Sequence, residues 1–513
     1  MLVKIYSAAL QGVNAQIITI EVNCSKGIKF FLVGLPDVSI KESHERITSA
    51  LDFNGMRFPR KQIVVNMAPA DIHKEGAGYD LPLAIGILAG SEIVKADRVS
   101  DYLMMGELSL DGQLKPVRGV LSIAIKAKEE GFKGVILPQM NAREAAVVAG
   151  LEVYGAENII DVIQFFNEEK TLERVVVDPR AEFYANQAGA DWDFSEVKGQ
   201  EQVKRALEVA CAGGHNLLFV GAPGAGKSML AKRIPSILPP LSLSESLETT
   251  KIHSVAGKIN HNGSLIAARP FRSPHHTISS VAMVGGGSYP QPGEISLAHN
   301  GVLFLDEIAE FQKSVLEVLR QPLEDRKITI SRSKFTVEYP AGFMLVASMN
   351  PCPCGHFNNP NKECVCKPYE VQKYLHRLSG PLLDRIDIQI EIVPVPFEAI
   401  SDTRPAESSA AIRERVIRAR RIQEARFATD EGIYCNAQMH TRLLHRHAQP
   451  DAAGLAQLKT AMERLNLSAR AYDRILRVAR TIADLEGSEN VLAHHIAESI
   501  GYRNLDRENW AEA

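Results

Sequence analysis

Two short motifs near the middle of the chain carry residues suited to phosphate chemistry. The first, at 221–228, reads Gly-Ala-Pro-Gly-Ala-Gly-Lys-Ser and fits the pattern G-x-x-x-x-G-K-[ST]. Its glycines let backbone N–H groups surround phosphate oxygens, Lys227 neutralises phosphate charge, and the Ser228 hydroxyl binds Mg²⁺. The predicted nucleotide-binding residues are Gly221, Ala222, Pro223, Gly224, Ala225, Gly226, Lys227 and Ser228. The motif therefore predicts a site for ATP and Mg²⁺.

The second motif is an apolar stretch that ends in two carboxylates, Gly-Val-Leu-Phe-Leu-Asp-Glu at 301–307. Phosphoryl transfer to water needs one acid for the metal and one for the water. We expect Asp306 to hold Mg²⁺ through water together with Ser228, and Glu307 to orient or deprotonate the attacking water. The residues alone leave one alternative open, in which the acid pair caps a helix that begins near Ala309.

A third apolar run, 342–350, ends in the amide of Asn350. Because the carboxyl ends of parallel strands share one edge of a sheet, this amide is expected beside the γ-phosphate, where it can hold the water. Suitable elements surround the phosphate loop: a helix is predicted over 201–212, a strand over 216–220 and a helix from Lys227. The order strand, glycine loop, helix is the context that the motif requires.

Bulk composition limits the class of protein. A chain of 513 residues is too long for one core and predicts about three domains. Hydrophobic content of 45% with 23% charged residues is typical of globular proteins, and a net charge of −3 argues against a wholly basic nucleic-acid coat. No apolar run is long enough to span a membrane, and the N-terminus lacks a secretory pattern. Seven cysteines, four of them inside 352–366, fit a reducing cytoplasm rather than a disulfide framework.

Four segments are predicted along the chain. Residues 1–167 alternate β-rich and helical stretches, and 168–190 are typical of a polar linker. Residues 191–395 hold the phosphate motifs, and 396–513 are mostly helical, with an amphipathic helix that Ser468 caps. The elements expected in the first segment are strands at 16–22, 30–33, 62–67 and 135–137, helices at 39–54 and 81–89, and a hairpin over 104–116 that turns at Asp111-Gly112.

Three further stretches resemble those of the magnesium-chelatase-like AAA+ ATPases, and specifically the ComM (YifB) family. Residues 269–276 read Arg-Pro-Phe-Arg-Ser-Pro-His-His, 292–299 lead into the acid-ended stretch, and 350–355 follow the amide-ended one. The resemblance covers nearly the whole chain, including the domain order. It implies a multi-domain α/β fold: an N-terminal α+β domain like that of Lon protease, a central AAA+ P-loop α/β domain with a helix-2 insertion and a pre-sensor-1 hairpin, and a C-terminal helical lid.

The resemblance gives Arg385 a role in catalysis. Its surroundings, Leu-Leu-Asp-Arg-Ile-Asp at 382–387, resemble the segment whose arginine finger stabilises charge on the γ-phosphate of a neighbouring subunit. A salt bridge with Asp384 or Asp387 is the structural alternative. Such a finger requires a homo-oligomer, which in this family is expected to be a ring of six.

A second arginine is a catalytic candidate on the resemblance alone. Arg470, in Ser-Ala-Arg at 468–470, resembles the sensor-2 arginine of the helical lid. Arg474 and Arg477 lie on nearly the same face of the predicted helix, so a purely structural role for Arg470 stays open.

Two segments resemble the channel-facing insertions of related ring motors. Residues 284–293 are rich in glycine and proline and predict a mobile loop. Residues 327–339 alternate apolar and polar side chains around Ser-Arg-Ser-Lys and predict a β-hairpin with a basic tip. Lys327, Arg332 and Lys334 would then contact DNA phosphates, a contact that binds without reading sequence. An ordinary solvated hairpin tip is the alternative.

Cys352, Cys354, Cys364 and Cys366 supply the four thiolates that tetrahedral Zn²⁺ prefers. Their C-x-C spacing is less common than C-x₂-C in zinc sites. Two redox pairs or inert thiols therefore remain alternatives, and His356 is a substitute ligand. A structural Zn²⁺ ion is a candidate cofactor beside ATP and Mg²⁺.

The N-terminal segment resembles the catalytic domain of Lon protease. The similar stretches are 74–78, 106–108, 112–119 and 135–138. The serine and lysine of active relatives are missing, because the matching positions read Gly-Ala-Gly at 76–78 and Val-Leu-Ser-Ile-Ala-Ile at 120–125. A Ser–Lys dyad needs both groups, and Ser122 does not stand at the nucleophile position. We expect an inactive protease fold that serves assembly or guides DNA.

The resemblance implies an ATP hydrolase that works as a ring-shaped motor on DNA, a helicase or branch-migration factor. ComM-like proteins are associated with integrating incoming DNA by homologous recombination during natural transformation. The implied partners are single-stranded, duplex or branched DNA, other copies of the chain and recombination proteins, with no membrane. The alternative is a magnesium-chelatase-type motor subunit that acts on a protein–porphyrin complex. An ATP-dependent protease is disfavoured by the missing dyad.

Overall fold

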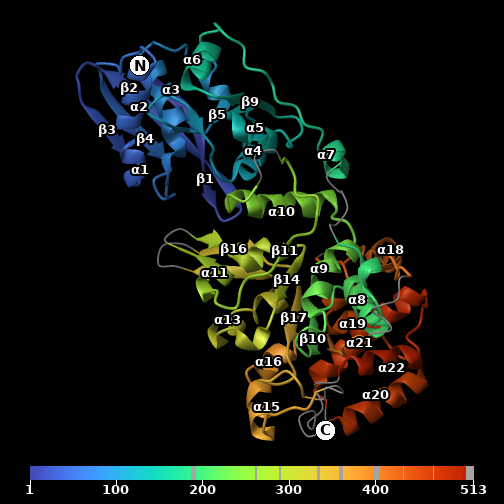
Figure 1. Ribbon diagram of the computed structural model, residues 1–513. Coiled ribbons are helices and arrows are strands. Elements are labelled where there is room, and N and C mark those ends of the chain that lie inside the picture. The colour runs from blue at the N-terminus through green and yellow to red at the C-terminus, as the bar shows by residue number, and fades with distance from the viewer. Residues whose placement is uncertain are drawn as a thin grey trace.

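The computed structural model describes residues 1–185, 192–259, 263–287, 290–331, 336–357, 362–396, 404–430, 432–465 and 467–503. Figure 1 shows an N-terminal α/β domain, a central domain built on a parallel sheet, and C-terminal helices that pack beside that sheet. The multi-domain α/β fold with a helical C-terminal region is confirmed.

The N-terminal domain contains a seven-stranded mixed sheet in the order β3-β4-β2-β1-β5-β8-β9. Its strands are β1 (Leu2–Gln11), β2 (Asn14–Ser25), β3 (Phe30–Val33), β4 (Gln62–Ala68), β5 (Tyr102–Met104), β8 (Gly134–Pro138) and β9 (Glu152–Ala156). Buried and more accessible residues alternate along β4, as the two-residue period of a strand requires. The strands predicted for this segment are all confirmed.

Helices cover the sheet of this domain. They are α1 (Val38–Lys41), α2 (Ser43–Phe53), α3 (Asp80–Gly90), α4 (Val120–Glu129), α5 (Gln139–Ala145) and α6 (Ile159–Phe166). The single helix predicted over 39–54 is interrupted, because Glu42 closes α1 through its own N–H and α2 begins at the next residue. The turn at Gly112, with φ of 85°, joins β6 (Glu107–Leu108) to β7 (Leu114–Lys115), but Met104 belongs to β5 instead of this hairpin.

The central domain contains five parallel strands in the order β11-β14-β17-β10-β18. They are β10 (Leu217–Gly221), β11 (Phe271–Arg272), β14 (Val302–Leu305), β17 (Met344–Met349) and β18 (Ile388–Ile392). The helices are α8 (Glu201–Gly213), α9 (Lys227–Ile237), α10 (Leu243–Val255), α11 (Ser280–Val284), α12 (Glu294–Leu297), α13 (Lys313–Glu317), α14 (Pro322–Asp325), α15 (Pro368–Leu375) and α16 (Gly380–Leu383). Strand, loop and helix around 216–237 follow the prediction.

The C-terminal helices share a core with the central domain. They are α18 (Ser409–Arg426), α19 (Thr441–His447), α20 (Ala452–Arg464), α21 (Ala469–Glu486) and α22 (Ala493–Gly501). Val416 of α18 and Ile482 of α21 are buried in the same apolar cluster as Leu217 of β10. Ser468 caps α21 as predicted, since its hydroxyl accepts the Ala471 N–H at 3.2 Å.

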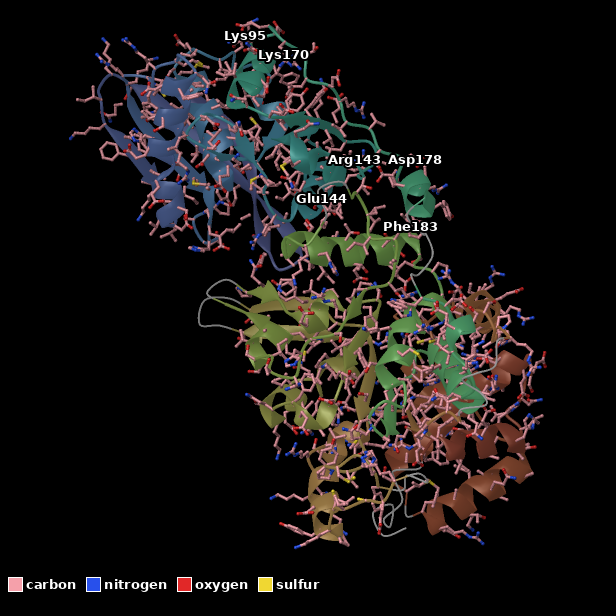
Figure 2. The ribbon with its side chains drawn as sticks, viewed as in Figure 1. Lys95, Arg143, Glu144, Lys170, Asp178 and Phe183 are labelled. Carbon is pink, nitrogen blue, oxygen red and sulfur yellow. The ribbon has the colours of Figure 1, made fainter. Side chains whose placement is uncertain are left out.

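Part of the segment predicted as a linker is folded. The α7 helix (Pro179–Ala185) begins after Asp178, whose side chain accepts two N–H groups of its first turn. Phe183 is buried in a cluster that joins the N-terminal and central domains, and Arg143 forms an ion pair with Glu182 at 2.5 Å (Figure 2). Residues 186–191 lie outside the described ranges.

The N-terminal domain rests on α10 (Figure 1). Glu144 is buried at this contact, where its carboxylate accepts the Leu121 N–H at 2.9 Å and the Ser254 hydroxyl (Figure 2). The Ser254 carbonyl in turn accepts the Gly119 N–H at 3.2 Å. A buried carboxylate therefore links the two domains.

Two insertions lie near this contact. The loop predicted over 284–293 forms a short antiparallel pair in its described residues, β12 (Gly285–Gly286) with β13 (Gln291–Pro292). The pair needs glycine, because a Cβ at Gly285 would lie 2.2 Å from the Gln291 carbonyl oxygen. The predicted second hairpin forms from β15 (Lys327–Ser331) and β16 (Thr336–Pro340).

Candidate functional site

The phosphate loop follows β10 and leads into α9. Gly224 and Gly226 have φ of 78° and 93°, a region that L-residues rarely adopt, so both positions favour glycine. A Cβ at Gly221 would lie 2.5 Å from the Ile392 carbonyl oxygen of the neighbouring strand β18. The three glycines of the motif therefore set the shape of the loop and its closeness to the sheet.

Lys227 is held inside the loop. Its ammonium donates to the carbonyl oxygens of Gly221 at 2.6 Å and Ala222 at 3.0 Å, and to Asn350 Oδ1 at 3.0 Å. Burial lowers the pKa of Lys227, while the nearby carboxylates of Asp306 and Glu307 oppose that shift. The lysine thus lies where phosphate oxygens would replace loop carbonyls as its acceptors.

Ser228 and Asp306 meet as the two motifs predict. The Ser228 hydroxyl donates to Asp306 Oδ2 at 2.7 Å, and the Ser348 hydroxyl donates to Asp306 Oδ1. A hydroxyl beside a carboxylate is a donor set that suits Mg²⁺, so the residues present fit the implied ion. Ser348 was missed by sequence reasoning, although its place near the end of the amide-ended strand was a usable signal.

Glu307 takes an unusual backbone conformation. Its φ is 52° and its ψ 50°, and its N–H donates to the Ser348 hydroxyl at 3.1 Å. A non-glycine residue in this left-handed region costs about 1 kcal/mol or more and is found at functional sites. Glu307 is exposed rather than folded back on the following turn. Its side chain is therefore free to reach a water molecule, and no side-chain cap on the next 3₁₀ turn is observed.

Asn350 and Gln200 complete the surroundings of the loop. Asn350 directly follows β17 and accepts the Lys227 ammonium, so the amide lies at the phosphate loop, as its predicted place beside the γ-phosphate requires. Gln200, with φ of 59°, donates its amide to the Ala225 carbonyl at 3.0 Å and was not predicted. Gln200 closes the phosphate loop from the side of α8.

Arg385 lies outside the phosphate-loop site, three residues before β18. Its guanidinium forms an ion pair with Glu324 at 2.5 Å and donates to the Pro381 carbonyl at 2.5 Å. The partner is thus neither of the two aspartates named as alternatives, because Glu324 of α14 reaches Arg385 just after α16. The side chain is 8% exposed, and its Nε has no hydrogen-bond partner among the described residues. The guanidinium of the predicted arginine finger therefore already has partners within its own chain.

Arg470 differs from the two arginines that share its helix. Its side chain is 64% exposed and lies 3.5 Å from Asp384. Arg474 forms a buried ion pair with Asp387, and Arg477 donates to the Met439 carbonyl at 2.9 Å. Arg474 and Arg477 therefore hold the helix in place, whereas Arg470 remains accessible at the start of α21.

The backbone of Arg385 lies at the end of the central sheet away from the phosphate loop of its own chain. Arg385 stands just before β18, and its carbonyl accepts the Asn216 amide at 2.9 Å, directly before β10. Both strands run from there toward the loop, with Gly221 opposite Ile392 at the other edge of the sheet. A parallel strand advances about 3.3 Å per residue, so roughly 13 Å of sheet separates the two edges.

The four cysteines are brought together as predicted. Their sulfur atoms all lie within 4.8 Å of one another, with Cys352 buried and the other three partly accessible. Cys352 Sγ lies 3.4 Å from Cys354 Sγ and 3.7 Å from Cys364 Sγ. The four thiols form one cluster rather than two separate pairs.

The basic hairpin is described only in part. Arg332 and Lys334 lie outside the described residues. Lys327 is exposed, but its ammonium pairs with Glu338 on the opposite strand at 2.9 Å. The turn between β1 and β2 packs on this hairpin, since a Cβ at Gly12 would lie 2.6 Å from Val337.

Two groups in the N-terminal domain bear on a protease function. Ser122 is 3% exposed and donates to the Val13 carbonyl at 2.6 Å, so its hydroxyl joins α4 to the turn between β1 and β2 of the same domain. Lys74 is buried and donates to the Gly34 and Pro69 carbonyls, with its pKa lowered by burial and raised by Asp71. Neither group is arranged as a nucleophile with its base.

Within the described residues, no helix is long and apolar enough to cross a membrane.

Three family models match the chain. The model described as magnesium chelatase, subunit ChlI, matches residues 193–400, that described as subunit ChlI of Mg-chelatase matches 20–141, and the C-terminal ChlI model matches 406–503. Together they cover all three bodies of the fold.

Known proteins are similar over almost the full length. The competence protein ComM of Haemophilus influenzae is 43% identical over 508 residues, 98% of this chain and 97% of its own. The uncharacterised protein YifB of Escherichia coli is 43% identical over 505 residues, with the same coverage. Lon protease 2 of Bacillus subtilis is 28% identical over 153 residues, 28% of this chain and 27% of its own. With its phosphate loop, acid-ended strand and Lon-like first domain, the chain belongs to the ComM (YifB) family of magnesium-chelatase-like AAA+ ATPases.

Proposed function

We propose that this protein hydrolyses ATP as a ring-shaped motor on DNA and promotes the integration of DNA by homologous recombination during natural transformation. The observation that carries the ATPase part is the meeting of Lys227, Ser228, Asp306 and Asn350 at one edge of the central sheet. The start of α9 and the residues that follow β14 and β17 supply this constellation, which is arranged for phosphate and a divalent cation.

Each residue has a defined task in this proposal. Loop N–H groups and Lys227 bind the β- and γ-phosphates, and Ser228 and Asp306 hold Mg²⁺, which supplies charge neutralisation when bound. Glu307 accepts a proton from the attacking water or orients it, since its side chain is exposed beside the loop. Asn350 holds the water on its other side once phosphate has replaced it as a partner of Lys227.

The position of the arginines supports an oligomer. Arg385 precedes β18 at the end of the sheet away from its own phosphate loop, and Arg470 lies beside Asp384 next to it, which supports a role for both at the site of a neighbouring subunit. Arg385 must leave Glu324 to do so, and its unpartnered Nε gives it a donor to offer. A closed ring, which we expect to have six members, lets every subunit both give and receive an arginine.

The DNA part of the proposal has separate support. The Haemophilus relative is named a competence protein, and the first domain of this chain carries no arranged nucleophile that would favour proteolysis. We propose that Arg332 and Lys334 contact DNA phosphates, with Lys327 in a smaller part because Glu338 already pairs with it. Single-stranded, duplex or branched DNA would then be bound through its backbone.

Two further elements complete the proposal. The four clustered thiols are the donor set for a structural Zn²⁺ ion. The chain works with recombination proteins in the cytoplasm, where cysteines stay reduced, and all seven cysteines are free thiols.

The test compares the wild type with Lys227→Ala in ATP turnover, strand unwinding and branch migration. DNA should stimulate ATP turnover by the wild type, and the variant should keep its circular-dichroism spectrum but lose ATP-dependent strand movement. Equal strand movement by both proteins, or turnover unaffected by single-stranded, duplex and branched DNA, would overturn the motor.

A magnesium-chelatase-type motor is the second candidate, because all three matching family models carry that name. Such a motor would act on a protein–porphyrin complex instead of DNA. The relative named a competence protein, which is 43% identical over 98% of the chain, favours the DNA motor. ATP turnover that ignores DNA but rises with a porphyrin-binding partner protein would favour the chelatase.

A further inference from the structure

The cysteine cluster lies directly against the phosphate loop. Gly355, inside the cluster, has φ of 80°, and a Cβ there would lie 2.5 Å from Pro223 Cδ and 2.7 Å from Pro223 Cγ. Pro223 is the third residue of the loop that binds ATP. No atom beyond a hydrogen fits between the Gly355 backbone and the Pro223 ring, so a shift of the cluster must move the loop or open a gap beside it.

The sulfur positions match a metal site and exclude disulfides. Cys354 Sγ lies 3.6 Å from Cys364 Sγ, and Cys352 lies 3.4 Å and 3.7 Å from these two. A zinc–sulfur bond of about 2.3 Å gives a tetrahedron whose sulfur atoms are about 3.8 Å apart. A disulfide bond measures about 2.05 Å, so all three distances fit thiolates around one cation.

The backbone around the cluster is also arranged for negative sulfur. The Phe357 N–H donates to Cys352 Sγ at 3.3 Å, and Cys352 has no exposed surface. A buried thiolate without a cation would be costly, because burial disfavours the charged form. Four thiols with no metal would therefore lack a reason to converge on one point.

The cluster is joined to the rest of the catalytic edge through the chain. It begins two residues after Asn350, which accepts the Lys227 ammonium. It ends before α15, and beyond this helix Arg377 pairs with Glu310 at 2.9 Å and donates to the Ala309 carbonyl at 3.2 Å. The loop that holds the thiols thus connects the amide-ended strand to the turn after the acid-ended strand.

We infer that Cys352, Cys354, Cys364 and Cys366 bind one Zn²⁺ ion, and that the bound metal holds Gly355 against Pro223 and keeps the phosphate loop in its ATP-binding shape. The inference rests on the proposed function for the identity of the nucleotide. According to this inference, the affinity for the nucleotide depends on a metal ion that does not contact the nucleotide. Removing the metal frees Gly355, and the loop then loses its support at Pro223.

The first experiment measures zinc. Full-length protein purified under reducing conditions should contain one Zn²⁺ per chain, and Cys354→Ser and Cys364→Ser should each lose it. Cys24→Ala, a buried cysteine of the N-terminal domain, is the matched control and should keep one zinc per chain. A wild type that holds no zinc as purified and takes up none from added zinc chloride would overturn the site.

The second experiment separates the metal from the contact with the loop. Gly355→Ala places a methyl group on Pro223 and leaves all four thiols in place. It should keep its zinc but bind a fluorescent ATP analogue about tenfold more weakly, as should chelator-treated wild type, which added zinc chloride should restore. Gly131→Ala is matched in φ, also 80°, and has nothing within 4 Å of the new methyl group.

The outcomes distinguish this inference from the proposed function. Zinc present but analogue affinity unchanged in Gly355→Ala would overturn the coupling. A wild type that binds the analogue yet moves no DNA strand would contradict the motor and leave the zinc-dependent affinity intact. If Gly131→Ala loses affinity as much as Gly355→Ala does, backbone strain explains the loss and the coupling is wrong.

Discussion

Ser228 donates its hydroxyl hydrogen to Asp306 at 2.7 Å, although 78 positions separate the two residues in the chain. The register of β14 on β17 adds a second hydroxyl to the same carboxylate, because Leu305 lies opposite Ala347 and so brings Ser348 beside Asp306. Asp306 therefore has both carboxylate oxygens engaged by hydroxyls from two other elements. This side chain is fixed before any ligand arrives, which lowers the cost of binding a cation.

Ser348→Ala should weaken the cation site. The change removes the donor to Asp306 and the acceptor of the Glu307 N–H, so both acids lose a positioning contact. We expect ATP turnover to fall about tenfold, with more Mg²⁺ needed for half-maximal rate, and unfolding free energy to drop by about 1 kcal/mol. Magnesium titrations of steady-state turnover measure the effect.

The control for this change is Ser296→Ala. Ser296 is a buried serine of the same domain whose hydroxyl has no hydrogen-bond partner among the described residues. It should leave the magnesium dependence unaltered. A Ser348→Ala enzyme with wild-type magnesium dependence would show that Asp306 does not need this serine.

Glu307→Gln should bind ATP but hydrolyse it slowly. The amide cannot accept the proton of the attacking water, so we expect turnover to fall at least about 100-fold while analogue affinity stays within about twofold. Glu310→Gln, three residues later and paired with Arg377 outside the loop, should change turnover little. If Glu307→Gln loses ATP binding as well, the residue supports the loop and is not the base.

The phosphate loop and its acids were predictable because a local pattern fixes them. Glycine spacing sets the loop, and an apolar run of four or five residues ending in a charged side chain indicates the end of a buried strand. Ser348 and Gln200 were not predictable in the same way. Their roles depend on strand register and on how α8 meets the loop, which a single sequence does not reveal.

The arginines show the same limit. The sequence places Arg385 between two aspartates, and nearness along the chain favours them as partners. The structure pairs it with Glu324 of α14, although 61 positions separate the two residues. The prediction of one continuous helix over 39–54 was wrong because a single residue, Glu42, ends α1 before α2 begins.

Arg385 should act on the site of a neighbour. Arg385→Ala alone should lower ATP turnover about 1000-fold, the contribution typical of an arginine finger. A mixture of Arg385→Ala and Lys227→Ala subunits should regain turnover, because an intact loop of one variant meets an intact arginine of the other. About a quarter of the interfaces in an evenly mixed ring are complete in this way.

The mixture must be compared with each variant alone at the same total concentration. The mixture would not regain ATP turnover if Arg385 acted on the phosphate site of its own chain, or if its role were only to pair with Glu324. Glu324→Gln, which removes that partner, supplies the second comparison and should keep at least part of the turnover because the arginine is released.

Glu144 should make the contact between the first two domains sensitive to pH. Burial raises the pKa of this carboxyl above its ordinary value of 4.5, against the lowering effect of its hydrogen bonds with Ser254 and Leu121. A raised pKa in the folded state means that the stability contributed by Glu144 is complete below about pH 4.5 and is lost as pH rises through the folded pKa. Glu144→Gln stays neutral throughout and can still accept both hydrogen bonds.

Melting temperatures of wild type and Glu144→Gln between pH 5 and pH 8 test this relationship. The melting temperature of the variant relative to that of the wild type should rise by about 2 °C over this pH range, because only the wild type then buries a charge at α10. Glu129→Gln, an exposed carboxylate of α4, is the control and should show no such divergence. If the melting temperatures of wild type and Glu144→Gln changed equally with pH, the charge on Glu144 would be compensated at the contact with α10 and would not destabilise it.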